Sequence, residues 1–345
     1  MTNSDTPSIH KIRRGQRKSV SVSQEALVQT RLLQPDQPLP FVIEPVVPDI
    51  GLTAWATENR DLILTHLRDH GGILFRGFNV HGIDDFQHFI KSVGGDMLEY
   101  AYRSTPRNQV SGKIYTSTEY PADQWIPMHN EMSYSRSWPM KIGFFSIKVA
   151  EDGGETPIVD SRKVFDRIPS DIRDNFRQKQ VMYIRNYGEG LDLPWENVFQ
   201  TDSKAEVEAF CRDHGIEFEW KDGNRLRTWQ ICQAVVDHPD TSEPLWFNQA
   251  HLFHISNLPA PVQESLLSTF GDHGLPRNAC YGDGSTIESE ALDAIRAAYA
   301  ETMVLFPWQM HDVLLLDNML VAHGRAPFTG TRKVVVGMAE TMSNQ

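Results

Sequence analysis

The chain has 345 residues, a net charge of −12 and a mean hydropathy of −0.40, and 40% of its residues are hydrophobic. This allows a sizeable core but excludes a membrane protein, because the longest apolar run, at 313–316, falls far short of the roughly 20 residues that a bilayer requires. The negative charge argues against nucleic-acid binding by the body of the protein. We expect a cytoplasmic protein, since no apolar signal segment is visible and the scattered cysteines (Cys211, Cys232 and Cys280) suit a reducing compartment.

Residues 1–34 are predicted to form a basic N-terminal arm, partly disordered or packed on the surface. Residues 10–18 (HKIRRGQRK) include five lysines or arginines. A solvated, mobile arm explains this run, and so does an electrostatic contact with an acidic partner. The sequence leaves both interpretations open.

The remaining elements follow from hydrophobic spacing and turn residues. Residues 35–49 are proline-rich and extended, and a buried strand opened by glycines is expected at 71–78. Short strands separated by turns predict a mainly β protein with flanking helices, built as a sandwich or a barrel-like pair of sheets. Helices are expected at 53–70, 83–93, 163–178, 203–213 and 287–301, and further strands at 142–149, 181–187, 303–306, 313–316 and 333–339.

Two histidines and a glutamate form a candidate metal site. His129 and Glu131 are one residue apart, and His323 lies far downstream. Residues i and i+2 of a strand point the same way, so we expect His129 and Glu131 to bind one metal from one strand. Two histidines and one carboxylate are the ligands of the non-haem Fe(II) oxygenases, where three coordination positions stay open. Taken alone, the triplet at 129–131 (HNE) could also be a chance pairing of a surface histidine with a surface glutamate.

Several further motifs support the metal site. With GGET at 153–156 and HGRAPFTGTRK at 323–333, the triplet resembles the taurine dioxygenase-like family of Fe(II)/2-oxoglutarate oxygenases. Within it, QVMYIRNYG at 180–188, WFNQAHLFH at 246–254 and YGDGSTIE at 281–288 are similar to the aspartyl-hydroxylase-like proteins of nonribosomal peptide clusters such as the syringomycin cluster. The resemblance implies Fe(II) as cofactor and 2-oxoglutarate and O2 as cosubstrates. It also implies one double-stranded β-helix (jelly-roll) domain over 35–345, with a helical and loop insertion at about 160–250.

The resemblance also implies residues for 2-oxoglutarate. Arg332 occupies the family position of the arginine that binds the distal carboxylate, for which a guanidinium fork is suited. Thr156 matches the family threonine that contacts the cosubstrate, and Arg325 is a weaker candidate that could instead pair with Asp317. An exposed base beside Lys333 and an ordinary threonine at a strand start are the structural alternatives.

Candidates for binding the substrate are less specific. Two arginines in YRSTPR could hold a substrate carboxylate or form surface pairs. Residues of YTSTE precede the metal triplet, and WFNQAH mixes polar groups with aromatics, as small-molecule pockets do. A structural role is the alternative for each, and a second metal site at His251 and His254 is disfavoured because no acidic or cysteine partner is nearby. The candidates are Arg103, Arg107, Tyr115, Thr118, Asn248 and His251.

The family resemblance implies a dioxygenase that hydroxylates an unactivated C–H bond. The expected substrate is an amino acid, or an aminoacyl unit on a carrier protein, in a nonribosomal peptide or other specialised-metabolite pathway. Glu131 disfavours halogenation, because halogenases of the family replace this carboxylate with a small residue. Desaturation or cyclisation of a free small molecule stays open, as does a non-catalytic regulator that binds a metabolite.

Overall fold

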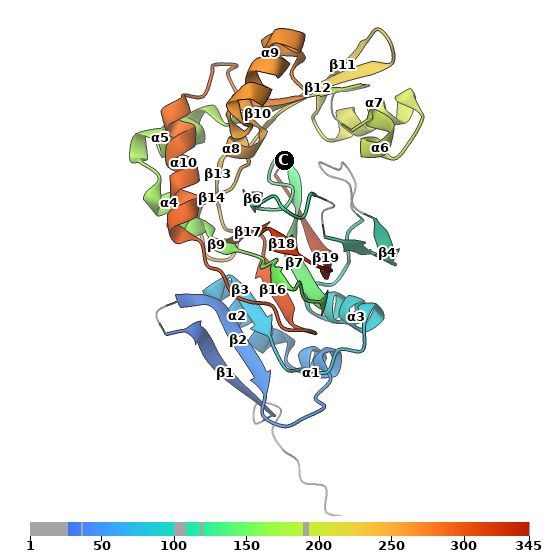
Figure 1. The fold of residues 1–345 in the computed structure, drawn as a ribbon, viewed down its shortest axis with the longest axis vertical. Helices are drawn as coiled ribbons and strands as arrows, with labels where there is room; N and C mark the ends of the chain where they lie inside the picture. Colours follow the sequence, from blue (N-terminus) through green and yellow to red (C-terminus); the bar gives the residue numbers. More distant parts are fainter. Residues whose placement is uncertain (1–26, 36, 100–107, 118–119, 189–192, 345) are drawn as a thin grey trace, which may run out of the picture.

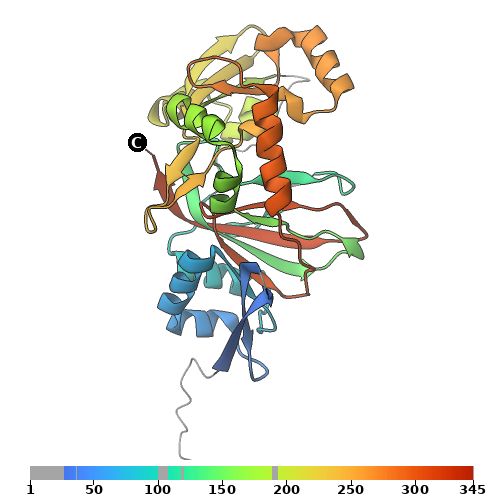
Figure 2. The same cartoon turned by 90° about the vertical axis from the view of Figure 1, so that its left-hand side faces the viewer.

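The computed structural model describes residues 27–35, 37–99, 108–117, 120–188 and 193–344. Its centre is an eight-stranded sheet, antiparallel except where its second and third strands pair in parallel. Figures 1 and 2 show this sheet between an N-terminal helical layer and a second, mainly helical body. In order across the sheet, the strands are β1 (Val28–Gln34), β2 (Gln37–Pro45), β3 (Gly72–Phe75), β16 (Val313–Asp317), β7 (Ser137–Lys148), β19 (Lys333–Ser343), β5 (Ile114–Thr116) and β4 (Gln109–Ser111).

Strand β16 shows why the middle of this sheet is apolar throughout. Val313 and Leu315 pack with the N-terminal helices, and Leu314 and Leu316 pack on the opposite face, in the interior of the jelly roll. Successive side chains of a strand point to opposite faces, so a strand buried on both sides must be apolar at every position. The run VLLL therefore has no polar face.

Three helices cover the outer face of the large sheet. The predicted helix at 53–70 is divided at Asn59, whose side-chain amide donates to the Trp55 carbonyl at 2.8 Å. The third helix lies so close to β7 that a Cβ on Gly143 would fall 2.2 Å from Ile90 Cδ1, so a larger residue there would require the Ile90 side chain to move. These helices are α1 (Leu52–Glu58), α2 (Arg60–His70) and α3 (Ile83–Gly94).

Smaller sheets complete the jelly roll opposite the large one. The three-stranded sheet has the order β6-β17-β9, and a two-stranded ladder lies beside it. The expected strand at 303–306 is reduced to one bridge, between Ile158 and Val304. The bounds are β6 (Ile126–His129), β17 (Val321–Arg325) and β9 (Ile158–Asp160), then β8 (Asp152–Gly153) and β18 (Phe328–Thr329).

The insertion builds a second body with its own core and sheet, of order β11-β12-β10-β15. Its last strand and helix lie beyond residue 250, so this body extends past the range expected from the sequence. Among the described residues, no helix is long and apolar enough to cross a bilayer. The elements are α4 (Ser161–Arg167), α5 (Ser170–Lys179), β10 (Val181–Tyr187), α6 (Trp195–Phe199), α7 (Lys204–Asp213), β11 (Glu217–Lys221), β12 (Arg225–Cys232), β13 (Val235–Asp237), β14 (Pro244–Trp246), α8 (Ala250–Phe253), η2 (Ile255–Asn257), α9 (Ala260–Gly274), β15 (Arg277–Tyr281) and α10 (Ser289–Thr302).

Candidate metal centre and active site

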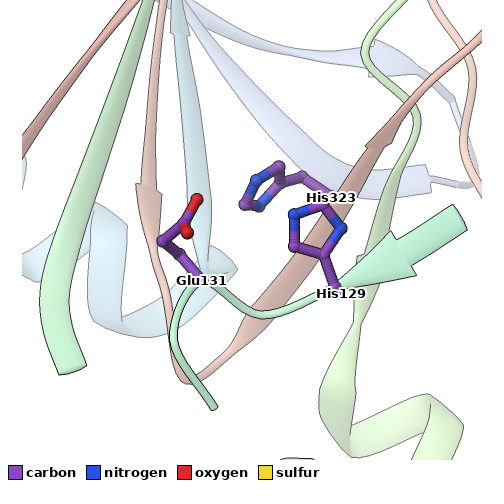
Figure 3. A group of neighbouring side chains, drawn as sticks. All are labelled: His129, Glu131 and His323. Carbon is purple, nitrogen blue, oxygen red and sulfur yellow. The ribbon is translucent and has the colours of Figure 1, made fainter. Parts of the chain in front are cut away.

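The three predicted metal ligands converge. One ligand atom from each of His129, Glu131 and His323 lies within 4.8 Å of the other two, and Figure 3 shows the side chains facing a common point. His129 and His323 are direct cross-strand partners on β6 and β17, with ring centroids 4.5 Å apart. The pairing of two short strands thus places together residues that are far apart in the sequence.

A glycine permits this pairing. Gly324 follows His323, and a Cβ at this position would lie 2.6 Å from the Ile126 carbonyl oxygen and 3.1 Å from Met128 Sδ. A larger residue would push β17 away from β6 and separate the histidines. On the other side, the Phe144 ring meets the His323 ring edge-on, with centroids 5.0 Å apart.

Glu131 reaches the site in a different way from the one predicted. Strand β6 ends at His129, and Glu131 begins a turn. Met132 has a φ of 59° and the Ser133 amide donates to the Asn130 carbonyl at 3.2 Å, so the chain reverses here. The expectation that one strand presents both residues was therefore wrong, because this turn directs Glu131 toward the histidines.

A small cavity beside the histidines contains the predicted 2-oxoglutarate residues. It is lined by Ser117, Thr156, Arg325 and Arg332, together with His129, His323 and apolar neighbours. The Arg332 guanidinium donates to the Gly154 carbonyl at 2.7 Å and to the hydroxyls of Thr156 and Ser117 at 3.4 Å each. Burial, and secondarily the charge of Arg325, lowers the pKa of Arg332 to about 10, so this cation remains charged at neutral pH.

Arg325 lines the same cavity but is held by the chain. Its guanidinium donates to the carbonyls of Tyr120, Pro121 and Gln124 at 3.0, 2.5 and 3.0 Å. Burial lowers the pKa of Arg325. The alternative pairing with Asp317 is absent, because that carboxylate accepts from His238 and from the amides of Met319 and Leu320.

A second, larger cavity of about 680 Å³ shares Ile126 and His129 with the small one. Glu131 also lines it, and β15 contributes Arg277. Among its described lining residues, Arg277 is the one arginine or lysine and Glu131 the one carboxylate. The other lining residues are mainly apolar or aromatic, including Trp125, Ile126, Leu252, Phe253, Ile255, Leu258, Val262 and Leu266.

The predicted substrate residues occupy different places. Arg103, Arg107 and Thr118 lie outside the described residues. Tyr115 is buried in the interior of the jelly roll. Asn248 is fully buried, where its amide donates to the Ala234 carbonyl at 3.0 Å and accepts from the Ala250 amide at 3.0 Å. Neither Tyr115 nor Asn248 is among the described residues that line the two cavities.

His251 supports the backbone beside the proposed ligand His129. Its Nε2 lies 3.0 Å from the Met128 carbonyl, next to His129, and its ring packs on Tyr299 with centroids 4.7 Å apart. Burial is the main cause that lowers the pKa of His251 from 6.5 to about 3. The ring is therefore neutral at physiological pH and donates its Nε2 proton to Met128. His254 lies in the next turn and lines the larger cavity.

This burial predicts how stability depends on pH. The unfolded chain protonates His251 near pH 6.5 and the folded chain only near pH 3, so acid favours unfolding between these values. The contribution of neutral His251 to the free energy of unfolding is complete above pH 6.5 and declines as the pH falls below it. In His251→Gln, which keeps a donor for Met128, we expect the loss of unfolding free energy between pH 7 and pH 5 to shrink by about 2 kcal/mol. Urea denaturation of metal-free protein tests this, and equal losses in both proteins would contradict it.

Other residues at the site were not identified from the sequence. Asn318 and Gln249 bind the backbone of Glu131 and Asn130, respectively. Trp308 donates its indole N–H to the Thr156 hydroxyl at 3.1 Å. Arg277 lies in the larger cavity. The dipeptide Asp317-Asn318 was visible in the sequence, but the Glu131 backbone that Asn318 binds lies 187 residues earlier in the chain.

The family of the chain follows from comparison with known proteins. The chain belongs to the taurine catabolism dioxygenase TauD, TfdA family, whose model matches residues 35–339. This confirms the predicted family of Fe(II)/2-oxoglutarate oxygenases, and with it the enzyme class, the cofactor Fe(II) and the cosubstrates 2-oxoglutarate and O2.

Two similar proteins cover most of the chain. The dapdiamide synthesis protein DdaC of Enterobacter agglomerans is 43% identical over 274 residues, which is 79% of this chain and 83% of that protein. A clavaminate synthase-like protein of Arabidopsis thaliana is 30% identical over 324 residues, 88% of this chain and 94% of that protein.

Solved structures confirm the predicted jelly roll. PvcB from Pseudomonas aeruginosa has a TM-score of 0.53 at 15% identity, with 94% of both chains covered. A second PvcB structure, described as an Fe, alpha-ketoglutarate dependent oxygenase from an isonitrile synthetic pathway, has a TM-score of 0.52 at the same identity and coverage. At this identity the likeness establishes the fold alone.

Proposed function

We propose that this protein hydroxylates an unactivated C–H bond of an amino acid, or of an aminoacyl unit on a carrier protein, in a specialised-metabolite pathway. The observation that carries the proposal is the position of His129 and Ile126, which line both cavities. A cosubstrate in the small cavity and a substrate in the large one would thus both adjoin His129, and each cavity adds one further proposed ligand, His323 in the small one and Glu131 in the large one. The similarity to a dapdiamide synthesis protein supports a biosynthetic pathway.

The donor set fits Fe(II). Two imidazoles and a carboxylate offer ligand atoms that lie within 4.8 Å of one another, and this donor set is the one that non-haem Fe(II) oxygenases use. His129 Nδ1 lies 2.8 Å from the Pro127 carbonyl, so it donates there and leaves Nε2 to bind metal. Bound Fe(II) supplies O2 activation coupled to decarboxylation of 2-oxoglutarate.

The chain's own residues would orient the two organic molecules. Arg332 would pair with the distal carboxylate of 2-oxoglutarate, while Thr156 donates its hydroxyl proton to the same group. The apolar wall of the larger cavity would exclude water from the C–H bond, and Arg277 would hold an anionic group of the substrate. Glu131 occupies the place that a halide would need, so hydroxylation is favoured over halogenation.

A product analysis tests the substrate proposal. Matched free and carrier-loaded amino acids are incubated with full-length protein and with a variant lacking residues 1–18. Mass spectrometry then measures the masses of the products. A carrier-bound substrate predicts a +16 product on the carrier and a turnover that falls with salt and with deletion of the arm, because exposed charges are screened. A +16 product from the free acid alone, unaffected by the deletion, would exclude the carrier. A −2 product would instead indicate desaturation or cyclisation.

Replacing Arg277 tests the role of the larger cavity. In Arg277→Gln we expect KM for the substrate to rise roughly 10- to 100-fold, since a hydrogen bond to a charged group contributes about 1.5–3 kcal/mol. Succinate release without substrate should be unchanged. Arg167→Gln is the control, because Arg167 forms an exposed ion pair with Glu301. An unchanged KM in Arg277→Gln would remove Arg277 from the substrate site.

A further inference from the structure

One side chain binds both backbone groups of Glu131. The Oδ1 of Asn318 accepts from the Glu131 amide at 2.7 Å, and its Nδ2 donates to the Glu131 carbonyl at 2.9 Å. The same Nδ2 donates to the Pro139 carbonyl at 2.8 Å, at the start of β7. Asn318 is fully buried, and two of its side-chain hydrogen bonds join it to Glu131 while the third joins it to β7.

The contact is reciprocal. Asn130, beside Glu131, donates its side-chain amide to the Asn318 carbonyl at 2.7 Å and to the Ser161 hydroxyl at 3.1 Å. Gln249 donates to the Asn130 carbonyl at 2.8 Å. The turn after β6 and the turn before β17 thus hold each other through two buried asparagines, and these strands carry His129 and His323.

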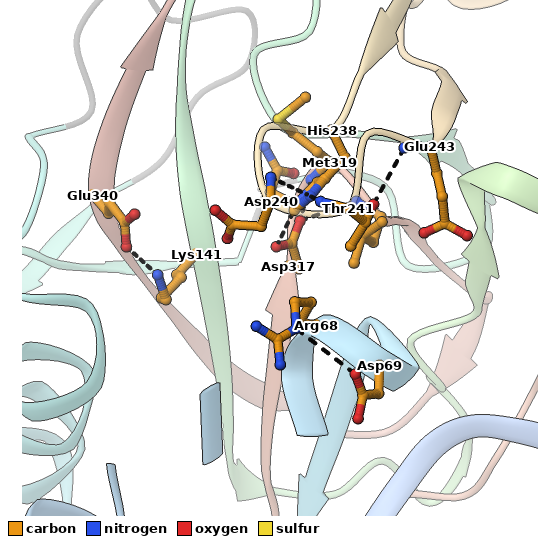
Figure 4. Close-up of polar contacts among 12 residues, drawn as sticks. Arg68, Asp69, Lys141, His238, Asp240, Thr241, Glu243, Asp317, Met319 and Glu340 are labelled. Carbon is orange, nitrogen blue, oxygen red and sulfur yellow. Dashed lines mark hydrogen bonds and ion pairs between the residues drawn. The ribbon is translucent and has the colours of Figure 1, made fainter. Parts of the chain in front are cut away.

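The turn that contains Asn318 is fixed from its other side as well. Asp317 accepts from the amides of Met319 and Leu320 at 2.9 and 3.0 Å. Its second carboxylate oxygen lies 3.1 Å from Nε2 of the buried His238, which belongs to the loop between β13 and β14 (Figure 4). Asn318 therefore lies in a rigid turn and has little freedom to follow Glu131 if that residue moves.

We propose that Asn318 is a positioning residue for the metal centre, which sets the carboxylate of Glu131 relative to the two histidines. The inference rests on the proposed metal site. Met132 holds a left-handed backbone, so the Glu131 peptide has no regular strand or helix to fix it. The asparagine side chain supplies that support. Outer-shell partners of this kind typically change metal affinity about 10- to 100-fold when they are removed.

The alternative is that Asn318 only stabilises the fold. Asn59 offers a matched control, since it is a buried asparagine whose amide donates to the Trp55 carbonyl in the outer helical layer. Asn318→Ala and Asn59→Ala should both lower the melting temperature. A positioning role predicts that Asn318→Ala alone changes metal binding.

The experiment measures Mn(II) affinity of folded protein by electron paramagnetic resonance, in saturating 2-oxoglutarate and well below the melting temperature of each variant. We expect the dissociation constant to rise about 10- to 100-fold in Asn318→Ala and to stay within twofold of the parent in Asn59→Ala. Asn318→Asp keeps the acceptor for the Glu131 amide but places an oxygen against the carbonyls of Glu131 and Pro139. It should therefore also bind Mn(II) more weakly, and it decides the matter if the alanine variant does not fold.

Parental Mn(II) affinity in either Asn318 variant would overturn the proposal. His129→Ala separates this result from a failure of the proposed metal site. If His129→Ala binds Mn(II) as the parent does, the site itself is wrong. If His129→Ala loses Mn(II) and the Asn318 variants keep it, only the positioning role is wrong.

Discussion

Replacing His129 or His323 by alanine is expected to abolish succinate formation and to remove most metal affinity. Each change deletes one of three protein ligands, so the loss should exceed the roughly 10- to 100-fold that removal of an outer-shell partner costs. Isothermal titration with Mn(II) measures the affinity, and 2-oxoglutarate decarboxylation measures the activity.

Glu131→Ala separates the carboxylate from the imidazoles. The two histidines remain paired across β6 and β17, so we expect weak residual metal binding without hydroxylation. His311→Ala is a suitable control, because His311 packs near Phe145 on the helix-covered side of the sheet. Full activity in purified His129→Ala or His323→Ala would contradict the proposed centre.

Arg332→Gln should have the second large effect. A bound 2-oxoglutarate would keep its distal carboxylate buried beside Thr156 without a cation, at a cost of about 2–5 kcal/mol. This corresponds to a rise of roughly tens- to thousands-fold in KM for 2-oxoglutarate, with nearly unchanged Mn(II) affinity. Steady-state kinetics over a range of 2-oxoglutarate concentrations checks it.

Two neighbouring variants make the arginine test specific. Thr156→Val should cost about 1 kcal/mol in 2-oxoglutarate binding, because one hydroxyl contact is lost. Arg325 already donates to three carbonyls, so Arg325→Gln should mainly lower thermal stability. If Arg332→Gln keeps the parental KM and Arg325→Gln raises it, the role passes to Arg325.

Local patterns predicted most of the fold. The predicted strand at 181–187 coincides with β10, where burial alternates along the strand, and the predicted helix at 83–93 coincides with α3, where burial follows the spacing of the apolar residues. The break at Asn59 was missed, since there the side chain donates to the Trp55 carbonyl of the preceding turn. The jelly roll itself came from the family resemblance, as spacing alone does not determine which strands pair.

The site was predictable only where residue chemistry is distinctive. Histidine, glutamate and arginine at family positions indicated the proposed ligands and the proposed cosubstrate contacts. Asn318 and Arg277 carry no such signal, because asparagine and arginine are common and their neighbours here come from other segments of the chain. The turn at Glu131 also escaped prediction, since alternation in a strand offered a simpler way to place two ligands.

The residues that line the larger cavity come from two separate parts of the molecule, which suits engineering. The metal end of the cavity belongs to the jelly roll, whereas much of its far wall comes from the segment between α8 and β15. A chimaera that exchanges residues 252–277 with those of a relative would change which compounds fit. Gln249 and His251 lie just outside this segment and bind the Asn130 and Met128 carbonyls, so the graft leaves these contacts in place. If the larger cavity binds the substrate as proposed, such recombination would alter substrate choice without rebuilding the proposed metal centre.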